Sequence, residues 1–522
     1  MPDKLFLAYD VGTTNQKTAL VDEKFNILGM SSGKYPVHIP KKNYAEQDPL
    51  DWWHMITKTT NQLRRERNLH FNDIAAIVFS GQALSTVLID KNGEPLMNSM
   101  IWMDARAAKQ AKELIGSGLI KISGYNLFTL LKFLRITKGG PGLAGKDVIP
   151  RILWLKENMP DIYKECYKIL DCNSYMIYKT TGEAVMSRFD ANLSWMMDTR
   201  RDAMNWSESI LDKYGIDKRK LPEIKPSTSI AGTLRREAAH ELNLPEGIPV
   251  IVGAGDIPCA AVGSSAVKER EFFVYIGTSD FMGAHIRERD VDISHYMGSL
   301  CSAIPDMYLY TGEQESAGSC LDWVKNEFFR DAEKDMGGEA YIVMDDGASR
   351  IAAGSEGLMF APWMGGEKTP VDDPCIRGGF HNLSLEHTRD HVTRAVLEGV
   401  ALNIRWAFRC MEKKIGEADY VNFSGGGAKS RVWCQIAADV LNREVRQVEN
   451  PAAAGVRGAA MIAAVGLGVY KNFSAAARRL RISGVFEPNA RYARLYDRLF
   501  LEFQKLYKST KGVCKDLNAR ST

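Results

Sequence analysis

The sequence has no excess of charge of either sign. Its 67 Lys and Arg residues nearly balance 64 Asp and Glu residues, which leaves a net charge of +3 over 522 residues. A chain so close to neutral offers no basic face for nucleic acid or for an acidic membrane surface, so we expect neither as a partner. Hydrophobic residues make up 45% and charged residues 25%, which excludes disordered, collagen-like and coiled-coil proteins.

Cysteines are few, and long apolar runs are missing. The nine cysteines form no C-x-x-C pair, which argues against a disulfide framework and against a cysteine zinc site. The most apolar late segment, 458–470, has 13 residues, whereas a membrane-spanning helix needs roughly 20. The chain starts directly with a strand-like segment and shows no signal-peptide pattern. We therefore expect a cytoplasmic protein with reduced thiols.

The length is too great for one hydrophobic core, since cores stop growing at roughly 250–300 residues. Two segments share one pattern, an apolar strand that ends in a Gly-Thr turn. Their glycines, Gly12 and Gly277, lie 265 residues apart, just over half the chain. This suggests a duplicated architecture, although chance resemblance of two turns is an open alternative. A stretch rich in helix and strand breakers at 222–247 places the boundary near its end, which gives domains 1–252 and 253–522.

Helical and strand patterns alternate in both halves. Strands are expected at 74–80 and 420–424, and helices at 49–68, 150–158, 387–412, 430–441 and 489–507. Mixed strands and helices of this kind indicate an α/β fold.

The two Gly-Thr turns fit phosphate binding. Each presents backbone N–H groups and hydroxyls that can surround phosphate oxygens, through Thr13 and Thr14 in the first half and Thr278 in the second. Asp10, at the end of the preceding strand, is suited to hold Mg²⁺, mostly through water. An ordinary hairpin, with Asp and Thr bonded to its own backbone, is the simpler interpretation of either turn alone.

Two further strand ends carry candidate residues. Three glycines at 425–427 follow a strand and open a helix, so a flat ligand can approach the backbone there; a tight turn is the alternative. Asp256 also follows a strand, and its carboxylate could accept a proton from a substrate hydroxyl. A helix N-cap fits Asp256 equally well.

Two other patterns are weaker. The segment 140–146 matches G-x-x-x-x-G-K, but Asp147 replaces the Ser or Thr of a P-loop, so a loop is favoured. His387 and His391 share a helical face without the glutamate of H-E-x-x-H, since position 388 is Thr388, which argues against zinc.

Taken together, the motifs resemble the FGGY carbohydrate kinases, in order and over nearly the whole chain. The resemblance rests on segments 10–14, 45–49, 80–82, 102–106, 181–183, 253–256, 277–279, 318–323, 391–399 and 425–428. It implies two ribonuclease H-like domains of the actin, Hsp70 and hexokinase type with a catalytic cleft between them. It also implies ATP-dependent phosphorylation of a sugar or polyol hydroxyl, with a pentulose such as xylulose as the expected substrate. Because the family commonly forms dimers, a homodimer is a further expectation.

The resemblance also implies roles for individual residues. Asp256 would be the general base and Asp10 the Mg²⁺ ligand. The residues expected to hold ATP are Thr13, Thr14, Lys17, Gly277, Thr278, Gly318, Asp322, Gly426, Gly427 and Ala428. Those expected on the sugar side are Gln82, Ala83, Trp102, Asp104 and Arg106, with a structural pairing of Asp104 and Arg106 as the alternative for Asp104.

The chain departs from the family pattern mainly on the sugar side. After Gln82, xylulokinases typically have Met-His, whereas this chain has Ala83 and Leu84. Ile257 stands where Asn or Gln usually follows the catalytic Asp. Losing partners for sugar hydroxyls changes specificity. The alternatives are therefore a kinase for another sugar or polyol, such as ribulose or glycerol, and a non-catalytic nucleotide-binding pseudokinase.

Overall fold

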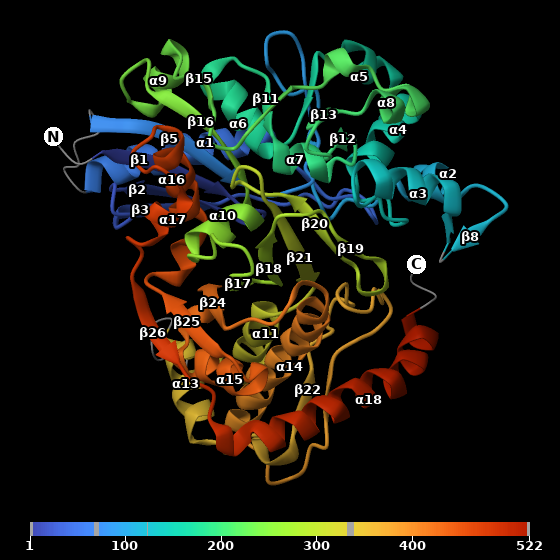
Figure 1. The fold of residues 1–522 in the computed structure, drawn as a ribbon, viewed down its shortest axis with the longest axis vertical. Coiled ribbons are helices and arrows are strands. Elements are labelled where there is room, and N and C mark those ends of the chain that lie inside the picture. The colour runs from blue at the N-terminus through green and yellow to red at the C-terminus, as the bar shows by residue number, and fades with distance from the viewer. Residues whose placement is uncertain (1–3, 67–72, 123, 331–338, 519–522) are drawn as a thin grey trace.

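Both Gly-Thr segments are hairpin turns between the first two strands of a mixed sheet (Figure 1). The computed structural model describes residues 4–66, 73–122, 124–330 and 339–518. Figure 1 shows one sheet in the upper part of the molecule and the other in the lower part, with helix α10 between them.

The first sheet has six strands in the order β15–β16–β5–β1–β2–β3. Strands β1, β2 and β3 form an antiparallel meander, and β5 and β16 continue the sheet parallel to β1. The strands are β1 (Leu5–Val11), β2 (Asn15–Val21), β3 (Ile27–Lys34), β5 (Ile74–Gly81), β15 (Ile230–Thr233) and β16 (Pro249–Gly255). Helices cover both faces, which explains why β5 and β16 are nearly continuous apolar runs.

The second sheet has eight strands in the order β19–β20–β21–β18–β17–β24–β25–β26. They are β17 (Phe272–Ile276), β18 (Asp280–Ile286), β19 (Val291–Asp292), β20 (Met297–Cys301), β21 (Tyr308–Gln314), β24 (Tyr420–Gly425), β25 (Glu444–Val448) and β26 (Ile482–Phe486). From β21 to β26 the order and directions repeat those of the first sheet from β3 to β15. Over these six strands the two sheets share one strand order, as the predicted duplicated architecture requires.

Helices pack on each sheet and between the sheets. On one face of the first sheet lie α1 (Pro49–Glu66), α6 (Cys172–Thr181) and α9 (Arg236–Leu242), and on the other α16 (Ala454–Gly466). Helix α10 (Asp256–Gly263) packs tightly on α16 and also contacts β18. Helices α14 (Arg389–Ile415) and α15 (Arg431–Leu441) pack on each other in the second half. The pair α10 and α16 therefore joins the two halves.

The remaining elements are insertions and peripheral helices. The helices are α2 (Ala108–Gly116), α3 (Leu127–Ile136), α4 (Val148–Asn158), α5 (Pro160–Glu165), α7 (Arg188–Leu193), α8 (Glu208–Tyr214), α11 (Gly318–Phe328), α13 (Ala340–Arg350), α17 (Phe473–Ala477) and α18 (Ala493–Asn518). The short strands are β4 (Glu46–Gln47), β6 (Val87–Ile89), β7 (Ser99–Met100), β8 (Lys121–Ile122), β9 (Tyr125–Asn126), β10 (Lys168–Leu170), β11 (Val185–Ser187), β12 (Met197–Asp198), β13 (Asn205–Trp206), β14 (Glu223–Lys225), β22 (Met359–Ala361) and β23 (Gly379–His381).

The expected helices are present. The ends of α4, α14 and α15 differ from the expectation by a few residues, whereas α18 begins at Ala493 and runs to Asn518, well beyond the expected end at 507. Helix α1 is described to Glu66, and residues 67 and 68 of the expected helix lie outside the described residues. The proposed boundary after residue 252 falls inside β16, which continues in the first sheet to Gly255. The 140–146 segment is a loop in which the Gly142 N–H bonds the Asp147 carboxylate at 2.8 Å.

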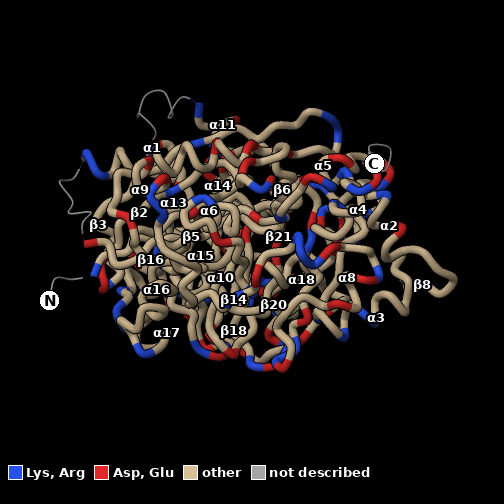
Figure 2. The backbone as a smooth tube through the Cα atoms, turned by 90° about the horizontal axis from the view of Figure 1, so that it is seen from above, with Lys and Arg blue, Asp and Glu red and all other residues tan. Residues whose placement is uncertain are grey.

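All nine cysteines lie in the described ranges, and none forms a disulfide. Across the described chain, no helix combines the length and the apolar character that crossing a membrane requires. Figure 2 shows acidic and basic residues interspersed over both halves of the molecule.

Candidate functional site

Asp10, Ser80 and Asp256 meet at one edge of the first sheet. Asp10 is aligned with Ser80 across β1 and β5, and Ser80 is aligned with Ala254 across β5 and β16. Because these three strands are parallel, their carboxyl ends share one edge, and Asp256 begins helix α10 directly after β16. This is the edge at which open α/β sheets bind ligands.

The environment of Asp256 favours its protonated form more than water does. Burial raises the pKa of Asp256 to about 7, and the carboxylates of Asp10 and Glu313 add to the effect. The Ile257 N–H donates to Asp256 Oδ1 at 2.9 Å, and this hydrogen bond partly opposes the rise in the pKa. A carboxylate with a pKa near neutrality is suited to general-base catalysis.

Asp10 lies between Lys17 and the start of helix α16. Lys17 Nζ is 3.8 Å from Asp10 Oδ2 and also donates to the Ala452 carbonyl at 3.3 Å. Burial alone would lower the pKa of Lys17, but the charge and hydrogen bond of Asp10 together with the charge of Tyr275 outweigh burial, and the pKa is raised. A Cβ at Gly455, in the first turn of α16, would come within 2.9 Å of Asp10 Oδ2. Glycine there lets the carboxylate reach the positive end of the helix.

The first hairpin is held by side chains from the expected sugar side. Trp102 Nε1 donates to Thr13 Oγ1 at 2.9 Å, and Gln47 Nε2 donates to the Thr13 carbonyl at 2.7 Å. Gln82 Nε2 in turn donates to Gln47 Oε1 at 2.7 Å. The Gln82 Oε1 is buried and accepts no hydrogen bond from the described residues, so it keeps an acceptor for a ligand hydroxyl. Thr14 is exposed at the tip of the turn.

The second hairpin forms a continuous backbone surface with helix α11. The Gly318 N–H donates to the Gly277 carbonyl at 2.9 Å, and the Ser319 N–H donates to the Thr278 carbonyl at 3.0 Å. A Cβ on Gly318 would lie 2.3 Å from the Gly277 carbonyl oxygen, so this contact needs glycine. Asp322 lies one turn further along α11, is exposed, and accepts a hydrogen bond from the Tyr341 hydroxyl.

The glycine-rich segment after β24 adjoins the second hairpin. Gly425 is aligned with Ile276 in the parallel pair β24–β17, directly before Gly277. A Cβ on Gly426 would meet no atom within 4 Å, so its backbone faces open space. Ala428 is buried, and its carbonyl accepts from Gln447 Nε2 at 2.6 Å. The structure thus brings Gly277, Gly318 and Gly426 to one end of the second sheet.

The two halves meet through Lys17 and Tyr275. Tyr275 precedes the second hairpin, and the positive charge of Lys17 acts to lower its pKa while burial, the larger effect, raises it. Asp10 and Asp256 also act on Tyr275. The first hairpin, the strand-end acids and the second hairpin therefore belong to one electrostatic environment.

Asp104 and Arg106 are bound to each other. Asp104 is fully buried and accepts from the Ala45 N–H at 2.8 Å and from Arg106 Nε at 2.9 Å. The Arg106 guanidinium also bonds Glu46 at 2.5 Å and stacks on Tyr44 with its centre 3.8 Å from the ring. This pairing is the structural alternative given above for Asp104, and it fixes the segment before helix α1.

The departures from the family pattern form one apolar region. Ile257 belongs to a buried cluster with Phe189 and Phe281, against which Ala83 and Leu84 pack. Leu84 has a φ of 55°, a left-handed conformation that is strained for leucine, and its carbonyl accepts from the Arg151 guanidinium. Next to Asp256, this cluster therefore presents apolar side chains, which cannot form hydrogen bonds with a ligand.

Comparison with known proteins also divides the chain into two domains, and it identifies their family. Residues 5–263 match the FGGY family of carbohydrate kinases, N-terminal domain, and residues 273–467 match the C-terminal domain of that family. The chain is 30% identical to the xylulose kinase of Lactococcus lactis over 517 residues, which covers 98% of both chains. The chain belongs to the FGGY family of carbohydrate kinases.

Solved structures give this FGGY kinase the same fold throughout. The xylulose kinase from Lactobacillus acidophilus superposes with a TM-score of 0.84 at 25% identity, covering 97% of this chain and 98% of the other. The gluconate kinase from the same organism gives a TM-score of 0.83 at 25% identity, with 98% of both chains covered. The predicted fold class is confirmed, and so is the prediction of a sugar phosphotransferase that uses ATP.

Several residues near Asp256 and near the apolar cluster of Ile257 had no site role in the sequence analysis. Glu313, on β21, raises the pKa of Asp256 and forms an ion pair with Lys368. Asp147 accepts from Trp195 Nε1 at 2.8 Å, and Trp195 packs on the apolar cluster of Ile257. No local pattern in the sequence marked Glu313, Lys368 or Trp195.

Proposed function

We propose that this FGGY kinase transfers the γ-phosphoryl group of ATP to a hydroxyl of a pentulose such as xylulose. The observation that carries the proposal is the position of Asp256, at the sheet edge beside Asp10 with a pKa raised to about 7. The similarity to a xylulose kinase over 98% of both chains supports the choice of pentulose.

Asp256 is the proposed general base. Its carboxylate accepts the proton of the substrate hydroxyl as the hydroxyl oxygen bonds to the γ-phosphorus of ATP. The bond between that phosphorus and the bridging oxygen breaks, and ADP leaves with the electron pair. A general base contributes typically about 10²–10⁴-fold to such a step.

The two hairpins and the glycine segment are the proposed ATP site. Backbone N–H groups and hydroxyls of Thr13, Thr14, Gly277 and Thr278, with the Lys17 ammonium, would stabilise the charge that spreads over the phosphoryl oxygens. The open backbone of Gly426 and its neighbours Gly427 and Ala428 would contact adenine, with Gly318 and Asp322 on the same side.

Asp10 fits Mg²⁺ that is held mainly by water and phosphate. Its side chain keeps 15% of its surface exposed, and its closest described cation, Lys17, stays 3.8 Å away. Within the described ranges, no three His, Cys, Asp or Glu side chains converge as a metal cage. Mg²⁺ commonly uses one or two carboxylates together with substrate phosphates. When bound, the ion would neutralise phosphate charge next to Asp10.

On the sugar side, Gln82 and Trp102 are the proposed contacts, with Ala83 beside them. The free Gln82 Oε1 would accept from a sugar hydroxyl, and Trp102 would present its ring while its N–H holds Thr13. For Asp104 and Arg106, the buried pairing supports positioning of this segment in place of direct contact.

A second candidate substrate is another sugar or a sugar acid such as gluconate. The apolar Ala83, Leu84 and Ile257 favour it, because a pocket that bonds different hydroxyls prefers a different sugar. The similarity to a gluconate kinase points in the same direction.

A substrate panel tests the proposal. ADP release with Mg-ATP would be measured on xylulose, ribulose, glycerol and gluconate, with the Asp256→Asn variant as the matched control. We expect the highest kcat/KM on xylulose. A higher value on another sugar would replace the substrate, and ATP binding without turnover on any sugar would favour a pseudokinase. A homodimer, a cytoplasmic location and the domain boundary after residue 252 stay predictions.

A further inference from the structure

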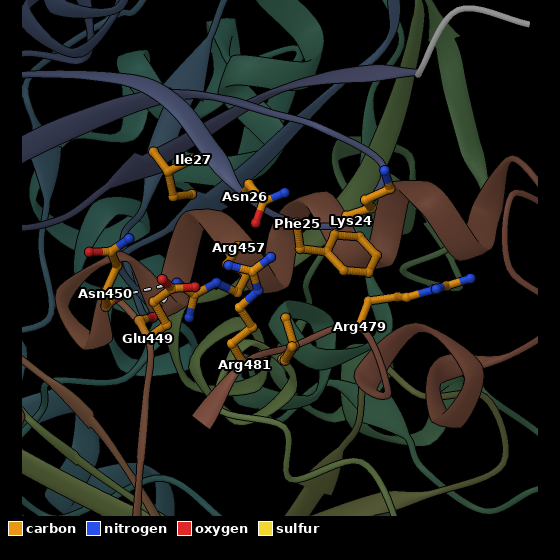
Figure 3. Close-up of a pocket in the computed structure, with 10 residues that line it drawn as sticks. Lys24, Phe25, Asn26, Ile27, Glu449, Asn450, Arg457, Arg479 and Arg481 are labelled. Atoms are coloured by element: carbon orange, nitrogen blue, oxygen red, sulfur yellow. Dashed lines mark hydrogen bonds between the residues drawn. The ribbon is translucent and has the colours of Figure 1, made fainter. Parts of the chain in front are cut away.

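A cationic pocket of about 180 Å³ lies at the junction of the two halves, away from the proposed ATP site (Figure 3). Its wall combines the β2–β3 turn of the first sheet with two connections of the second half, 449–450 before helix α16 and 479–481 before β26. Figure 3 shows the β2–β3 turn on one side of the pocket and Glu449, Arg479 and Arg481 on the other. The β2–β3 turn and the turn that carries Thr13 and Thr14 lie at opposite ends of strand β2, so the pocket is at the far end of the first sheet from that hairpin turn.

Positive charge dominates the wall. Four cationic side chains line the pocket, Lys24, Arg457, Arg479 and Arg481, against the single carboxylate of Glu449. Among the described residues, none of the four has a carboxylate within the 4.0 Å of an ion pair, whereas other cations of the same chain, such as Arg446, form such pairs. Four positive charges against one carboxylate leave a net positive charge in the pocket, so this arrangement favours a bound anion.

Arg457 gives the pocket a buried, fixed guanidinium. It is 4% exposed and extends from the first turns of α16. Its donors reach only neutral carbonyl oxygens, those of Gly263 at 3.5 Å, Asn450 at 3.4 Å and Glu449. Burial lowers the pKa of Arg457 to about 10, and the negative charge of Glu449 only partly opposes this effect. These carbonyl bonds hold the group in place beside the pocket.

The geometry points to a site for a small phosphate-bearing anion at this junction. Guanidinium groups bond phosphate oxygens through two parallel N–H donors, which a lysine or a neutral pocket cannot reproduce. The volume far exceeds the roughly 10–15 Å³ that one water molecule needs. Inorganic phosphate and a phosphate monoester share this chemistry, and the experiment separates them.

Binding would be measured by isothermal titration calorimetry on the full chain, with ADP in excess to fill the nucleotide site. The probes are inorganic phosphate, ribose 5-phosphate and, as an uncharged control, ribose. The test variant is Arg479→Gln with Arg481→Gln, both at exposed positions where folding is expected to be unaffected. The matched control is Arg478→Gln, because Arg478 is the exposed neighbour that does not line the pocket.

We expect the wild type and the Arg478→Gln variant to bind a phosphate-bearing probe with equal affinity, and the double variant to bind it at least tenfold more weakly. Affinity should also fall with added salt. Binding of ribose 5-phosphate alone identifies a monoester site, and binding of inorganic phosphate alone identifies a free-phosphate site. Absence of saturable binding by the wild type, or equal binding by the double variant, overturns the proposal.

A second measurement distinguishes loss of the binding site from misfolding of a variant. The melting temperatures of all variants would be compared without ligand and with the probe that binds. Ligand-induced stabilisation should be present in the wild type and in Arg478→Gln and be lost in the double variant, since only the folded pocket binds. Equal stabilisation in the double variant contradicts the site.

Discussion

The indole Nε1 of Trp102 donates a 2.9 Å hydrogen bond to the hydroxyl of Thr13. One contact therefore joins the segment proposed to hold the sugar to the hairpin proposed to hold phosphate. The position of the Thr13 hydroxyl depends on an aromatic residue 89 positions later in the chain.

Replacing Trp102 with Phe should lower kcat/KM about fivefold to tenfold. An aromatic ring remains, although it is smaller than the indole, but the donor to Thr13 is lost, and a hydrogen bond of this kind contributes about 1 kcal/mol. Steady-state kinetics on Trp102→Phe, Thr13→Ala and the double variant measure this effect. If the two residues act through their contact, the double variant loses no more than the worse single variant. Additive losses would show that they act separately.

Asp256→Asn should lower kcat by about 10²–10⁴-fold, the usual effect of removing a general base. In the wild type, kcat/KM should rise with pH through about 7, where the Asp256 carboxyl loses its proton. The pH profile of initial rates measures both statements, with circular dichroism as the control for folding. A flat profile between pH 5.5 and 8.5 would contradict the assignment of the base.

The same substitution should make the protein more stable at pH 8. Because folding raises the pKa of Asp256 from 3.8 to about 7, the folded state binds more protons than the unfolded state between these values. Stability from this group is present below pH 4 and is lost as pH rises to 7. Three pKa units set an upper bound of about 4 kcal/mol. Urea unfolding should show that Asp256→Asn gains most stability at pH 8 and much less at pH 5, and the reverse trend would show that folding does not raise the pKa of Asp256.

Removing Arg106 should destabilise the fold by about 3–5 kcal/mol, since Asp104 would be left buried without its cation. The pair Asp198 and Arg200 is a matched control in the same chain. It has the same spacing and the same Nε contact, at 3.0 Å, but its arginine side chain is 43% exposed. Arg200→Ala should cost much less stability than Arg106→Ala, because exposed ion pairs contribute little. Urea unfolding of Arg106→Ala and Arg200→Ala gives the comparison, and equal losses would contradict a structural role for Arg106.

Gly426→Ala should leave the melting temperature unchanged and raise the KM for ATP. Its Cβ would enter open space in the free protein, and its φ of −63° suits any residue. Only a ligand lying on this backbone would meet the new methyl group. Gly318→Ala should instead lower the melting temperature as well, because its Cβ would lie 2.3 Å from the Gly277 carbonyl oxygen. An unchanged KM for ATP in Gly426→Ala would place adenine elsewhere.

Much of the site was predictable because its residues sit next to local signals. The Gly-Thr turns, the three glycines after β24 and Asp256 after β16 each follow an apolar strand, and the ends of parallel strands meet at one edge of a sheet. Glu313 and Lys368 were not predictable in this way. Their ion pair joins β21 to a loop 55 residues away, and no local pattern records that separation.

By itself, the sequence determined the α/β class, the two Gly-Thr hairpins and the family, because these depend on short-range patterns of apolar, glycine and hydroxyl residues. Only the tertiary structure decided that helix α16, from the end of the chain, packs on the first sheet and brings Gly455 to Asp10. It also decided that burial and two neighbouring carboxylates raise the pKa of Asp256. Electrostatic environment and burial depend on which distant segments pack together, and that is a property of the folded molecule alone.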